Sequence, residues 1–241
     1  MSGHSKWSTI KRKKGLIDAE RGKIFQKLAK EIYVAAKSGD PNPDTNPTLR
    51  MVVDKAKAAN MPKDKIQAAI DKASKSAGGE DYEFIRYEGY ASGGVAIMVD
   101  CLTDNRNRTA SQVRSTFTKR GGNLGTDGSV SYMFEKKGII LIDKSYDEDT
   151  IMTIALDNDA LDFIINDDSY EIETSEDSFS QINKALEEND VTNITMNEIR
   201  YVPSNYISLD TDKQEKVLAL VEALEDLDDV QDVYHNLEVN E

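Results

Sequence analysis

The sequence contains little of the chemistry that disulfides, metal sites and membrane spans require. Its 241 residues include one cysteine and two histidines. Cys101 alone cannot form a disulfide framework, and with His4 and His235 it supplies too few soft ligands for a metal cluster. No run of about 18 apolar residues occurs, and the basic N-terminus lacks the apolar stretch of a secretory signal. We therefore expect a cytoplasmic protein with no metal and no membrane partner.

Catalytic and nucleotide-binding signatures are also missing from the sequence. No Ser/His/Asp or Cys/His arrangement is present. The stretch GGNLGTDGS at 121–129 lacks the Lys-Ser/Thr of a phosphate-binding loop, so we interpret its glycines as a helix end followed by entry into a hairpin. The stretch DNDALDFIINDD at 157–168 lacks the Gly and Glu of a calcium loop, which indicates a solvated acidic face. The sequence thus predicts no enzyme and no cofactor.

Charge is abundant and is distributed unevenly along the chain. The formal net charge is −14, yet residues 1–80 carry 17 Lys and Arg against 9 Asp and Glu. Residues 81–137 are nearly balanced at 8 against 7, and residues 138–241 carry 5 against 28. A basic front and an acidic back favour an anionic partner that binds at one end of the chain.

Helical periodicity dominates the first 77 residues. Apolar residues at spacings of three and four predict a helix over 18–37 that ends at Ser38-Gly39. A second helix is predicted around 49–56 from the same kind of apolar stripe. In NMPKDKIQAAIDKA we predict a third helix, which Asn60 can cap while Pro62 occupies its first turn. Three helices with short connections indicate a small bundle.

Beyond residue 80 the pattern alternates between strands and helices. Strands are predicted at 82–90, 93–104, 129–134, 138–142, 169–174, 193–209 and 230–238, and helices at 108–120, 147–160, 178–189 and 211–226. Units this short indicate compact α/β layers of the ferredoxin-like kind.

Six motifs occur in an order that closely resembles the YebC family. They are GHSKW at 3–7, RGKIF at 21–25, NMPK at 60–63, YEGY at 87–90, TDNRNRT at 103–109 and GGNLGTDGSVSYMF at 121–134. The resemblance implies an α+β fold in which an N-terminal three-helix domain is followed by two ferredoxin-like α/β domains, the third inserted into the second. On this basis we expect a basic helical domain at 1–79, a discontinuous α/β domain at 80–135 plus 203–241, and an acidic insertion at 136–202.

The resemblance also implies a function, although in two different forms. Members of the family are conventionally described as probable transcriptional regulators that bind DNA. The family also includes a mitochondrial translational activator of cytochrome oxidase, and bacterial relatives have been connected with stalled ribosomes. The two descriptions share a contact with nucleic acid.

The first candidate binding surface is a row of cations near the N-terminus. Its members are Lys6, Lys11, Arg12, Lys13, Lys14, Arg21, Lys23, Lys27 and Lys30. Residues 23, 27, 30 and 37 share one helix face opposite the apolar stripe, and few acidic residues lie near them in the sequence. This pattern predicts an unneutralised ridge for phosphates; the alternative is an ordinary solvated helix face. Trp7 either stacks on a base or packs against the bundle.

The second candidate surface lies at a predicted strand-to-helix junction. Its cations are Arg106, Arg108, Arg114, Lys119 and Arg120. Backbone N–H groups and the helix dipole favour an anion at such a junction. The alternative is that Asp104, Asn105 or Asn107 caps the helix and that Lys119 and Arg120 complement its C-terminal dipole. Both interpretations are compatible with each other.

Three functional hypotheses follow. The first is a nucleic-acid-binding regulator that acts in translation through contacts with rRNA or the ribosome. The second is a transcription regulator that binds double-stranded DNA, and the third is an acidic protein-interaction scaffold. We expect any protein partner to bind the acidic third domain, whose surface could equally serve only to solvate the protein.

Overall fold

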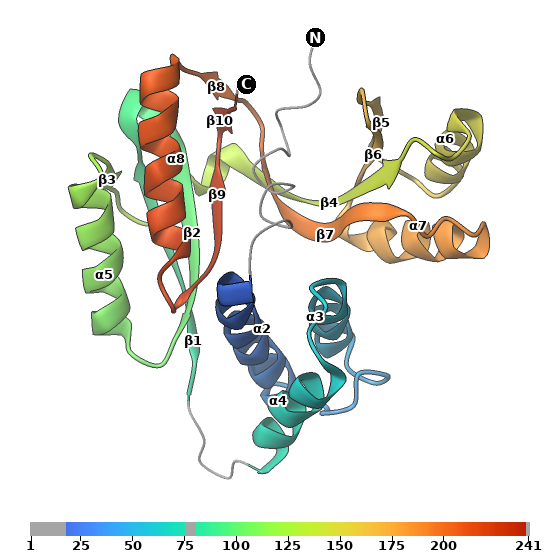
Figure 1. The fold of residues 1–241 in the computed structure, drawn as a ribbon, viewed down its shortest axis with the longest axis horizontal. Coiled ribbons are helices and arrows are strands. Elements are labelled where there is room, and N and C mark those ends of the chain that lie inside the picture. Colours follow the sequence, from blue (N-terminus) through green and yellow to red (C-terminus); the bar gives the residue numbers. More distant parts are fainter. Residues whose placement is uncertain (1–17, 76–80, 240–241) are drawn as a thin grey trace.

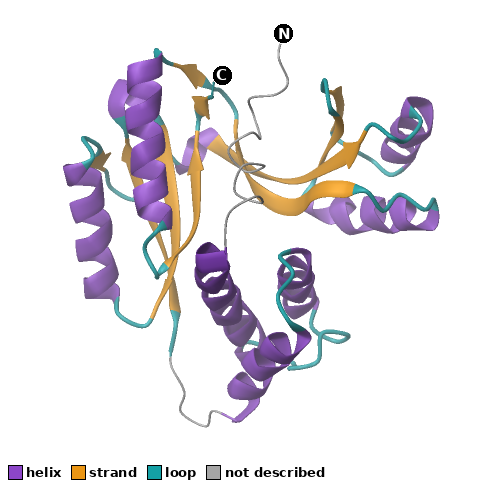
Figure 2. Ribbon diagram, in the orientation of Figure 1, coloured by secondary structure: helices purple, strands orange, loops and turns teal. Residues whose placement is uncertain are grey.

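The N-terminal part of the molecule is a bundle of three helices. The computed structural model describes residues 18–75 and 81–239. The bundle consists of α2 (Asp18–Lys37), α3 (Pro47–Ala58) and α4 (Lys63–Lys75). Leu28, Ile32 and Leu49 are at most 3% exposed and lie at the centre of its core, as the apolar stripe predicts. Figures 1 and 2 show the bundle on one side of two β-sheets.

Two asparagines mark where α3 begins and ends, one through its side chain and one through its backbone. The Oδ1 atom of Asn46 accepts a hydrogen bond from the Leu49 N–H at 3.0 Å, which caps the start of the helix. Asn60 has a φ of 59°, and the Met61 N–H next to it donates to the Ala56 carbonyl at 2.9 Å. Asn60 therefore closes α3 in the left-handed conformation, and the expectation that it caps α4 is wrong.

The first sheet contains β1 (Glu83–Tyr90), β2 (Ala96–Thr103), β3 (Asn123–Leu124) and β9 (Val230–His235) in the antiparallel order β3-β1-β2-β9. Helices α5 (Arg106–Lys119) and α8 (Thr211–Glu225) pack on it, with Phe117 and Leu220 fully buried in the core that they share with the sheet. A short parallel pair, β8 (Ile207–Ser208) with β10 (Leu237–Glu238), lies nearby in Figure 1.

The second sheet lies, in the sequence, between β3 and α8 of the first. Its elements in chain order are β4 (Phe134–Asp143), α6 (Glu148–Asp157), β5 (Asp162–Ile165), β6 (Ser169–Thr174), α7 (Glu176–Glu188) and β7 (Ile194–Pro203). The antiparallel strand order β5-β6-β4-β7 is that of a ferredoxin-like fold. The predicted α+β fold class, with one sheet inserted into the sequence of the other, is confirmed, but the order β3-β1-β2-β9 of the first sheet differs from the ferredoxin-like order expected for it. The limits assigned to each domain stay a prediction.

Two local predictions differ from the structure. The expected strand at 129–134 contains a 3-10 turn over Ser131–Met133, and β4 then runs without interruption from Phe134. The N–H groups of Val130 and Ser131 both donate to the Glu88 carboxylate at 2.7 Å, so they are not available to a strand ladder. The segment expected to be only a solvated acidic face contains the edge strand β5. An edge strand tolerates charged residues, which hides its pattern in the sequence.

Candidate nucleic-acid interface

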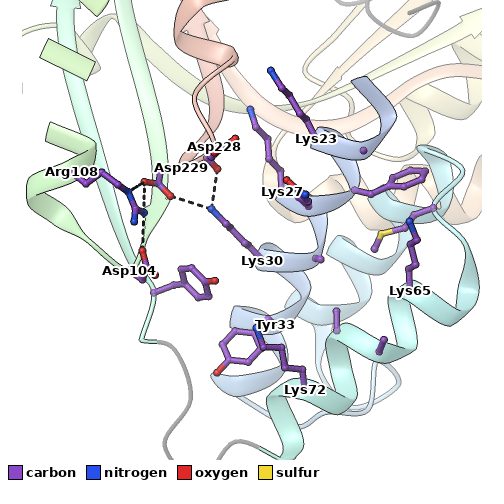
Figure 3. Close-up of a pocket in the computed structure, with 18 of the residues that line it drawn as sticks. Lys23, Lys27, Lys30, Tyr33, Lys65, Lys72, Asp104, Arg108, Asp228 and Asp229 are labelled. Atoms are coloured by element: carbon purple, nitrogen blue, oxygen red, sulfur yellow. Dashed lines mark hydrogen bonds and ion pairs between the residues drawn. The ribbon is translucent and has the colours of Figure 1, made fainter. Parts of the chain in front are cut away.

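A cleft of about 820 Å³ separates the helical bundle from the first sheet. Its walls come from α2, α4, the start of α5 and the loop between α8 and β9, as Figure 3 shows. The cationic residues that line it are Lys23, Lys27, Lys30, Lys65, Lys72 and Arg108, and the acidic ones are Asp104, Asp228 and Asp229. The fold thus brings cations from both candidate surfaces of the sequence to one place.

The lysines of α2 bind the end of α8 and the loop that follows it. Lys23 forms an ion pair with Asp226 at 2.9 Å, and Lys27 donates to the Glu225 carbonyl at 2.6 Å. Lys37, on the same face, pairs with Asp81 at 2.7 Å. The prediction of an unneutralised ridge is therefore wrong. Carbonyls at the end of α8 carry the negative end of its dipole, which explains why cations gather there.

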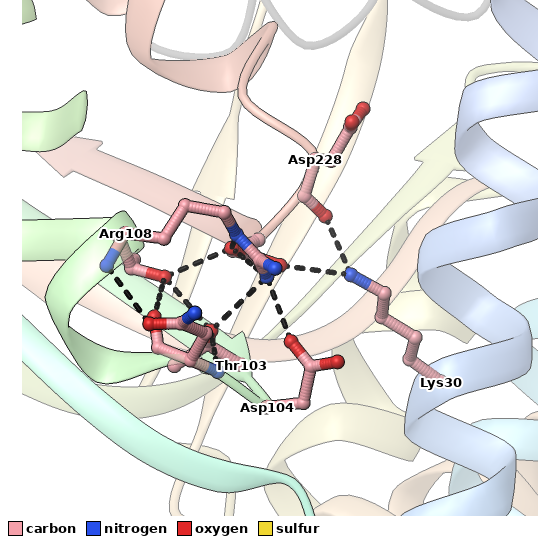
Figure 4. A network of polar contacts seen from close by, with 8 residues as sticks. Lys30, Thr103, Asp104, Arg108 and Asp228 are labelled. Atoms are coloured by element: carbon pink, nitrogen blue, oxygen red, sulfur yellow. Dashed lines mark hydrogen bonds and ion pairs between the residues drawn. The ribbon is translucent and has the colours of Figure 1, made fainter. Parts of the chain in front are cut away.

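Asp229 is the centre of this contact between the bundle and the sheet. It is 2% exposed and accepts hydrogen bonds from Arg108 Nε at 3.1 Å and Nη2 at 2.7 Å, and from Thr109 Oγ1 at 2.8 Å. Lys30 Nζ approaches it at 3.1 Å and also donates to the Asp228 carbonyl, as Figures 3 and 4 show. Burial alone would raise the pKa of Asp229, but the donors Arg108, Thr109 and Lys30 lower it below its usual value.

The two arginines of the TDNRNRT motif have different surroundings. Arg108 joins Asp229 to Asp104, which it contacts at 2.8 Å. Arg106 is 69% exposed and lies 3.7 Å from Glu83. Asn105 is the cap of α5, because its side chain accepts from the Arg108 N–H at 3.1 Å. The capping alternative is thus correct for Asn105, and Arg108 has a structural role in addition to any contact with an anion.

The remaining candidates are placed outside the cleft. Arg114, Lys119 and Arg120 are exposed along α5, whose contribution to the cleft lining is Arg108 and Gln112. Arg21 is exposed one residue before the part of α2 that lines the cleft. Lys6, Trp7, Lys11, Arg12, Lys13 and Lys14 lie outside the residues that the structure describes, so their role stays a prediction.

Three aromatic rings also line the cleft, each with a lysine next to it. Lys65 lies 5.3 Å from the centre of the Phe25 ring, and Lys72 lies 5.5 Å from that of Tyr33. Lys30 lies 5.8 Å from the ring of Tyr82. Sequence reasoning missed the α4 lysines, although residues 65 and 72 are seven apart and therefore share a helix face. It also missed the rings, whose meeting depends on the packing of α2 against α4.

A second contact fixes the bundle to the first sheet. Lys55 of α3 donates to both carboxylate oxygens of Glu31 at 3.1 Å and lies 3.8 Å from Asp232 of β9. Burial of Lys55 lowers its pKa, but the nearby carboxylates of Asp232 and Glu31 outweigh this effect and raise the pKa above the usual value. The bundle is thus attached to the sheet by ion pairs at Asp229 and at Asp232.

The glycine-rich loop holds a carboxylate of the protein itself. The Glu88 side chain accepts from the N–H groups of Gly128, Val130 and Ser131 at 2.7–2.9 Å. Burial raises the pKa of Glu88, but these backbone donors outweigh it and the pKa is lowered. The N–H groups that a phosphate would need are therefore occupied. Gly121, with a φ of 74°, lies at the end of α5, where the Gly122 N–H donates to the Phe117 carbonyl, as the helix-end interpretation predicts.

Within residues 18–75 and 81–239, no group of three or more His, Cys, Asp and Glu is arranged to hold a metal ion. None of the helices in those same ranges has the length and apolar character needed to cross a membrane.

Comparison with known proteins gives matches over nearly the whole chain. A family model described as the TACO1/YebC protein N-terminal domain matches residues 5–76, and a model of the TACO1/YebC second and third domain matches residues 82–237. A probable transcriptional regulatory protein of Geobacillus kaustophilus is 52% identical, over 99% of this chain and 98% of its own. One of Borreliella burgdorferi is also 52% identical, over 100% and 99%. The crystal structure of a conserved hypothetical protein from Aquifex aeolicus has a TM-score of 0.82 at 44% identity and covers 93% of each chain.

Proposed function

Because the chain belongs to the TACO1/YebC family, we propose that it is a nucleic-acid-binding regulator of gene expression that acts in the cytoplasm on translation, through contacts with ribosomal RNA. Its relatives carry the name probable transcriptional regulatory protein, which supports regulation in general. The contact with ribosomal RNA and the action in translation go beyond what these names state.

The observation that supports the proposal best is the collection of cations around one cleft in a protein of net charge −14. Lys65 and Lys72 of α4 lie over aromatic rings of the cleft, while the α2 lysines and Arg108 also hold the segment around Asp229. A surface that neutralises phosphates gains affinity from the release of counterions, even when the protein as a whole is acidic. The basic residues at 11–14 are predicted from their charge alone to add phosphate contacts.

A second candidate is a transcription regulator that binds double-stranded DNA. The printed names of the relatives favour it. The exposed residues Arg114, Lys119 and Arg120 on α5 would then contact the DNA backbone, since such cations position a duplex without reading its sequence. The acidic second sheet is also available to a protein partner, as the scaffold hypothesis requires.

One purification separates these candidates. The full-length protein is isolated from lysate at low and at high salt, and the bound material is identified by sequencing and mass spectrometry. We expect ribosomal RNA at low salt and its loss at high salt, because phosphate contacts weaken as salt rises. Genomic DNA in place of RNA would support the second candidate. Protein partners without nucleic acid would contradict both.

A charge variant tests whether the N-terminal segment takes part. Changing Lys11, Arg12, Lys13 and Lys14 to Ala should flatten the salt dependence of RNA binding by roughly three units of slope, because each lost contact removes about 0.7. The matched control changes the exposed Lys144, Lys184, Lys213 and Lys216 to Ala, which alters the net charge equally. Equal losses in the two variants would show that only total charge matters.

A further inference from the structure

We propose that the cleft between α2, α4 and the α8–β9 loop binds an unpaired stretch of nucleic acid, whose bases stack on Phe25 and Tyr82 and whose phosphates bind Lys65 and Lys72. The inference rests on the proposed function and names the form of nucleic acid that this site accepts. It concerns residues that the charge pattern of the sequence does not identify.

The accessible rings of the cleft are placed to stack on two separate bases of one strand. Phe25 and Tyr33 are eight residues apart on α2, which corresponds to about 12 Å along the helix axis. Tyr33 meets Tyr82 edge to face, with ring centres 5.8 Å apart, so Tyr82 continues the aromatic surface toward the first sheet. Tyr33 itself is only 3% exposed, whereas Phe25 and Tyr82 are partly buried and both line the cleft. The accessible rings therefore lie toward opposite ends of the cleft.

The lysines are placed where a sugar-phosphate backbone would pass. Lys65 and Lys72 are seven residues apart on α4, about 10 Å, and each lies over a ring of the cleft. Both are exposed, so their long side chains can turn toward a phosphate that passes along α4. Pairs of a cation and an aromatic ring are the elements with which proteins bind single strands, because the cation follows the backbone while the ring stacks on any base.

The size and shape of the site favour an unpaired strand over a duplex. A volume of about 820 Å³ lies in the range of small-ligand pockets and accommodates a few nucleotides. A duplex keeps its bases stacked inside the helix, so it presents nothing that could stack on Phe25 or Tyr82. An acidic peptide could use the lysines but has no flat ring to cover the aromatic residues. The combination of rings and cations therefore points to unpaired bases.

The test measures binding of the full-length protein to three labelled ligands by fluorescence anisotropy. The ligands are a 12-nucleotide single-stranded RNA, a duplex of the same sequence, and an abasic strand of the same length that has phosphates but no bases. The double variant Phe25→Leu with Tyr82→Leu keeps apolar volume but removes both flat rings. We expect it to bind the single strand at least roughly tenfold more weakly, since each stacking contact accounts for a factor of this order. Its binding to the duplex and to the abasic strand should not change.

The matched control is Phe84→Leu with Tyr132→Leu. These two aromatic residues are 60% and 72% exposed and lie outside the cleft lining. We expect this control to bind all three ligands as the parent does. If the cleft variant and the control behave alike toward the single strand, the inference is wrong. If the parent binds none of the three ligands, the proposed function itself fails.

A second measurement uses the unaltered protein, so it does not depend on the stability of a variant. RNA that contains 4-thiouridine is crosslinked to the protein, and the tryptic peptides that carry RNA are identified by mass spectrometry. We expect crosslinks in the peptides 24–27 and 76–86, which contain Phe25 and Tyr82. Crosslinks only elsewhere would overturn the inference. Full competition by polyglutamate of equal charge would also overturn it, because it would assign the cleft to an acidic peptide.

Discussion

Two rows of lysines face the same cleft, and they differ in what they contact. On α2, Lys23 binds a carboxylate, Lys27 a backbone carbonyl and Lys30 both kinds of group. On α4, Lys65 and Lys72 lie over aromatic rings. The first row therefore joins the helical bundle to the first sheet, while the second is placed to meet a ligand.

The comparison shows that the charge of a residue does not by itself identify a binding surface. Both rows look alike in the sequence, as cations at helical spacing. What distinguishes the α2 row is its contact with the Glu225–Asp229 segment, which is about 200 residues away in the chain. The acidic segment covers the face of α2 on which the sequence predicts a phosphate-binding surface. Four predictions test this distinction, beginning with the largest effect.

The largest effect is expected from Asp229→Asn. The substitution leaves Arg108, Thr109 and Lys30 around a neutral amide, whose NH₂ group must face either Lys30 or the donors of Arg108 and Thr109. We expect a loss of about 2–3 kcal/mol in the free energy of unfolding, since hydrogen bonds to a buried charged group are involved. Urea denaturation measures it. The control is Asp226→Asn, because Asp226 is 66% exposed in its pair with Lys23 and should cost less than about 1 kcal/mol.

The pH dependence of this difference provides an independent check. The pKa of Asp229 is lowered in the folded protein, so the unfolded chain binds the proton at higher pH than the folded one. The carboxylate therefore stabilises the fold above about pH 4 and loses its effect as the pH falls further. The stability gap between parent and Asp229→Asn should be constant from pH 6 to 8 and should shrink below pH 4. A gap that is equally large at pH 3 would show that the charge of Asp229 is not the cause.

The next largest effect separates two arginines that the sequence presents as equivalent. Arg108→Ala removes the partner of Asp229 and should destabilise the protein by about 2 kcal/mol. Arg106→Ala should change stability by less than about 0.5 kcal/mol, because Arg106 is 69% exposed and 3.7 Å from its acidic neighbour. Thermal unfolding of both variants measures the difference. Similar destabilisation by both would show that the junction depends on total charge and not on the Asp229 contact.

More of the fold than of the site could be predicted from the sequence, because helices and strands follow from local patterns whereas the site depends on contacts between distant residues. The limits of α2 follow from local apolar spacing, and the cap of α5 is one of three neighbouring candidates. The pairing of Lys30 with Asp229 joins residues 199 apart, and no local pattern specifies it. The turn at Ser131–Met133 looked like a strand because its side chains alternate, yet its N–H groups donate to Glu88, which lies more than 40 residues earlier. Local rules therefore predicted elements, while the site arises from contacts between them.

A smaller effect, on binding alone, tests the two rows of lysines directly. Lys65→Ala with Lys72→Ala should flatten the salt dependence of single-stranded RNA binding by about 1.4 units, at about 0.7 for each phosphate contact. Lys23→Ala with Lys27→Ala changes the charge equally but should flatten it by less than half as much, because these lysines already hold the α8–β9 segment. Anisotropy titrations at several salt concentrations give both slopes. Equal slopes would show that nucleic acid displaces the acidic segment and uses both rows.

The smallest effect concerns the acidic second sheet. If its carboxylates repel nucleic acid from the rest of the molecule, changing the exposed Asp157, Asp159, Asp162, Asp167 and Asp168 to Asn should strengthen non-specific binding at low salt. Asn also tolerates the φ of 59° at position 159, so the backbone should be preserved. We expect no more than about a twofold gain, because Figure 1 places β5 and α6 on the side of the second sheet away from α2.

The salt dependence shows whether this gain in non-specific binding is electrostatic. Screening shortens the range of the repulsion to about 10 Å at 0.1 M salt and about 30 Å at 0.01 M, so the gain should be present at 0.01 M and absent at 0.15 M. Gel-shift titrations of random duplex DNA and single-stranded RNA at the two salt concentrations measure it, with the lysine variants of α4 as a reference for an effect inside the cleft. A gain that persists at 0.15 M would mean that these carboxylates lie close to the bound nucleic acid. In that case the ligand extends beyond the cleft and across the second sheet, and the cleft would be one part of a larger binding surface.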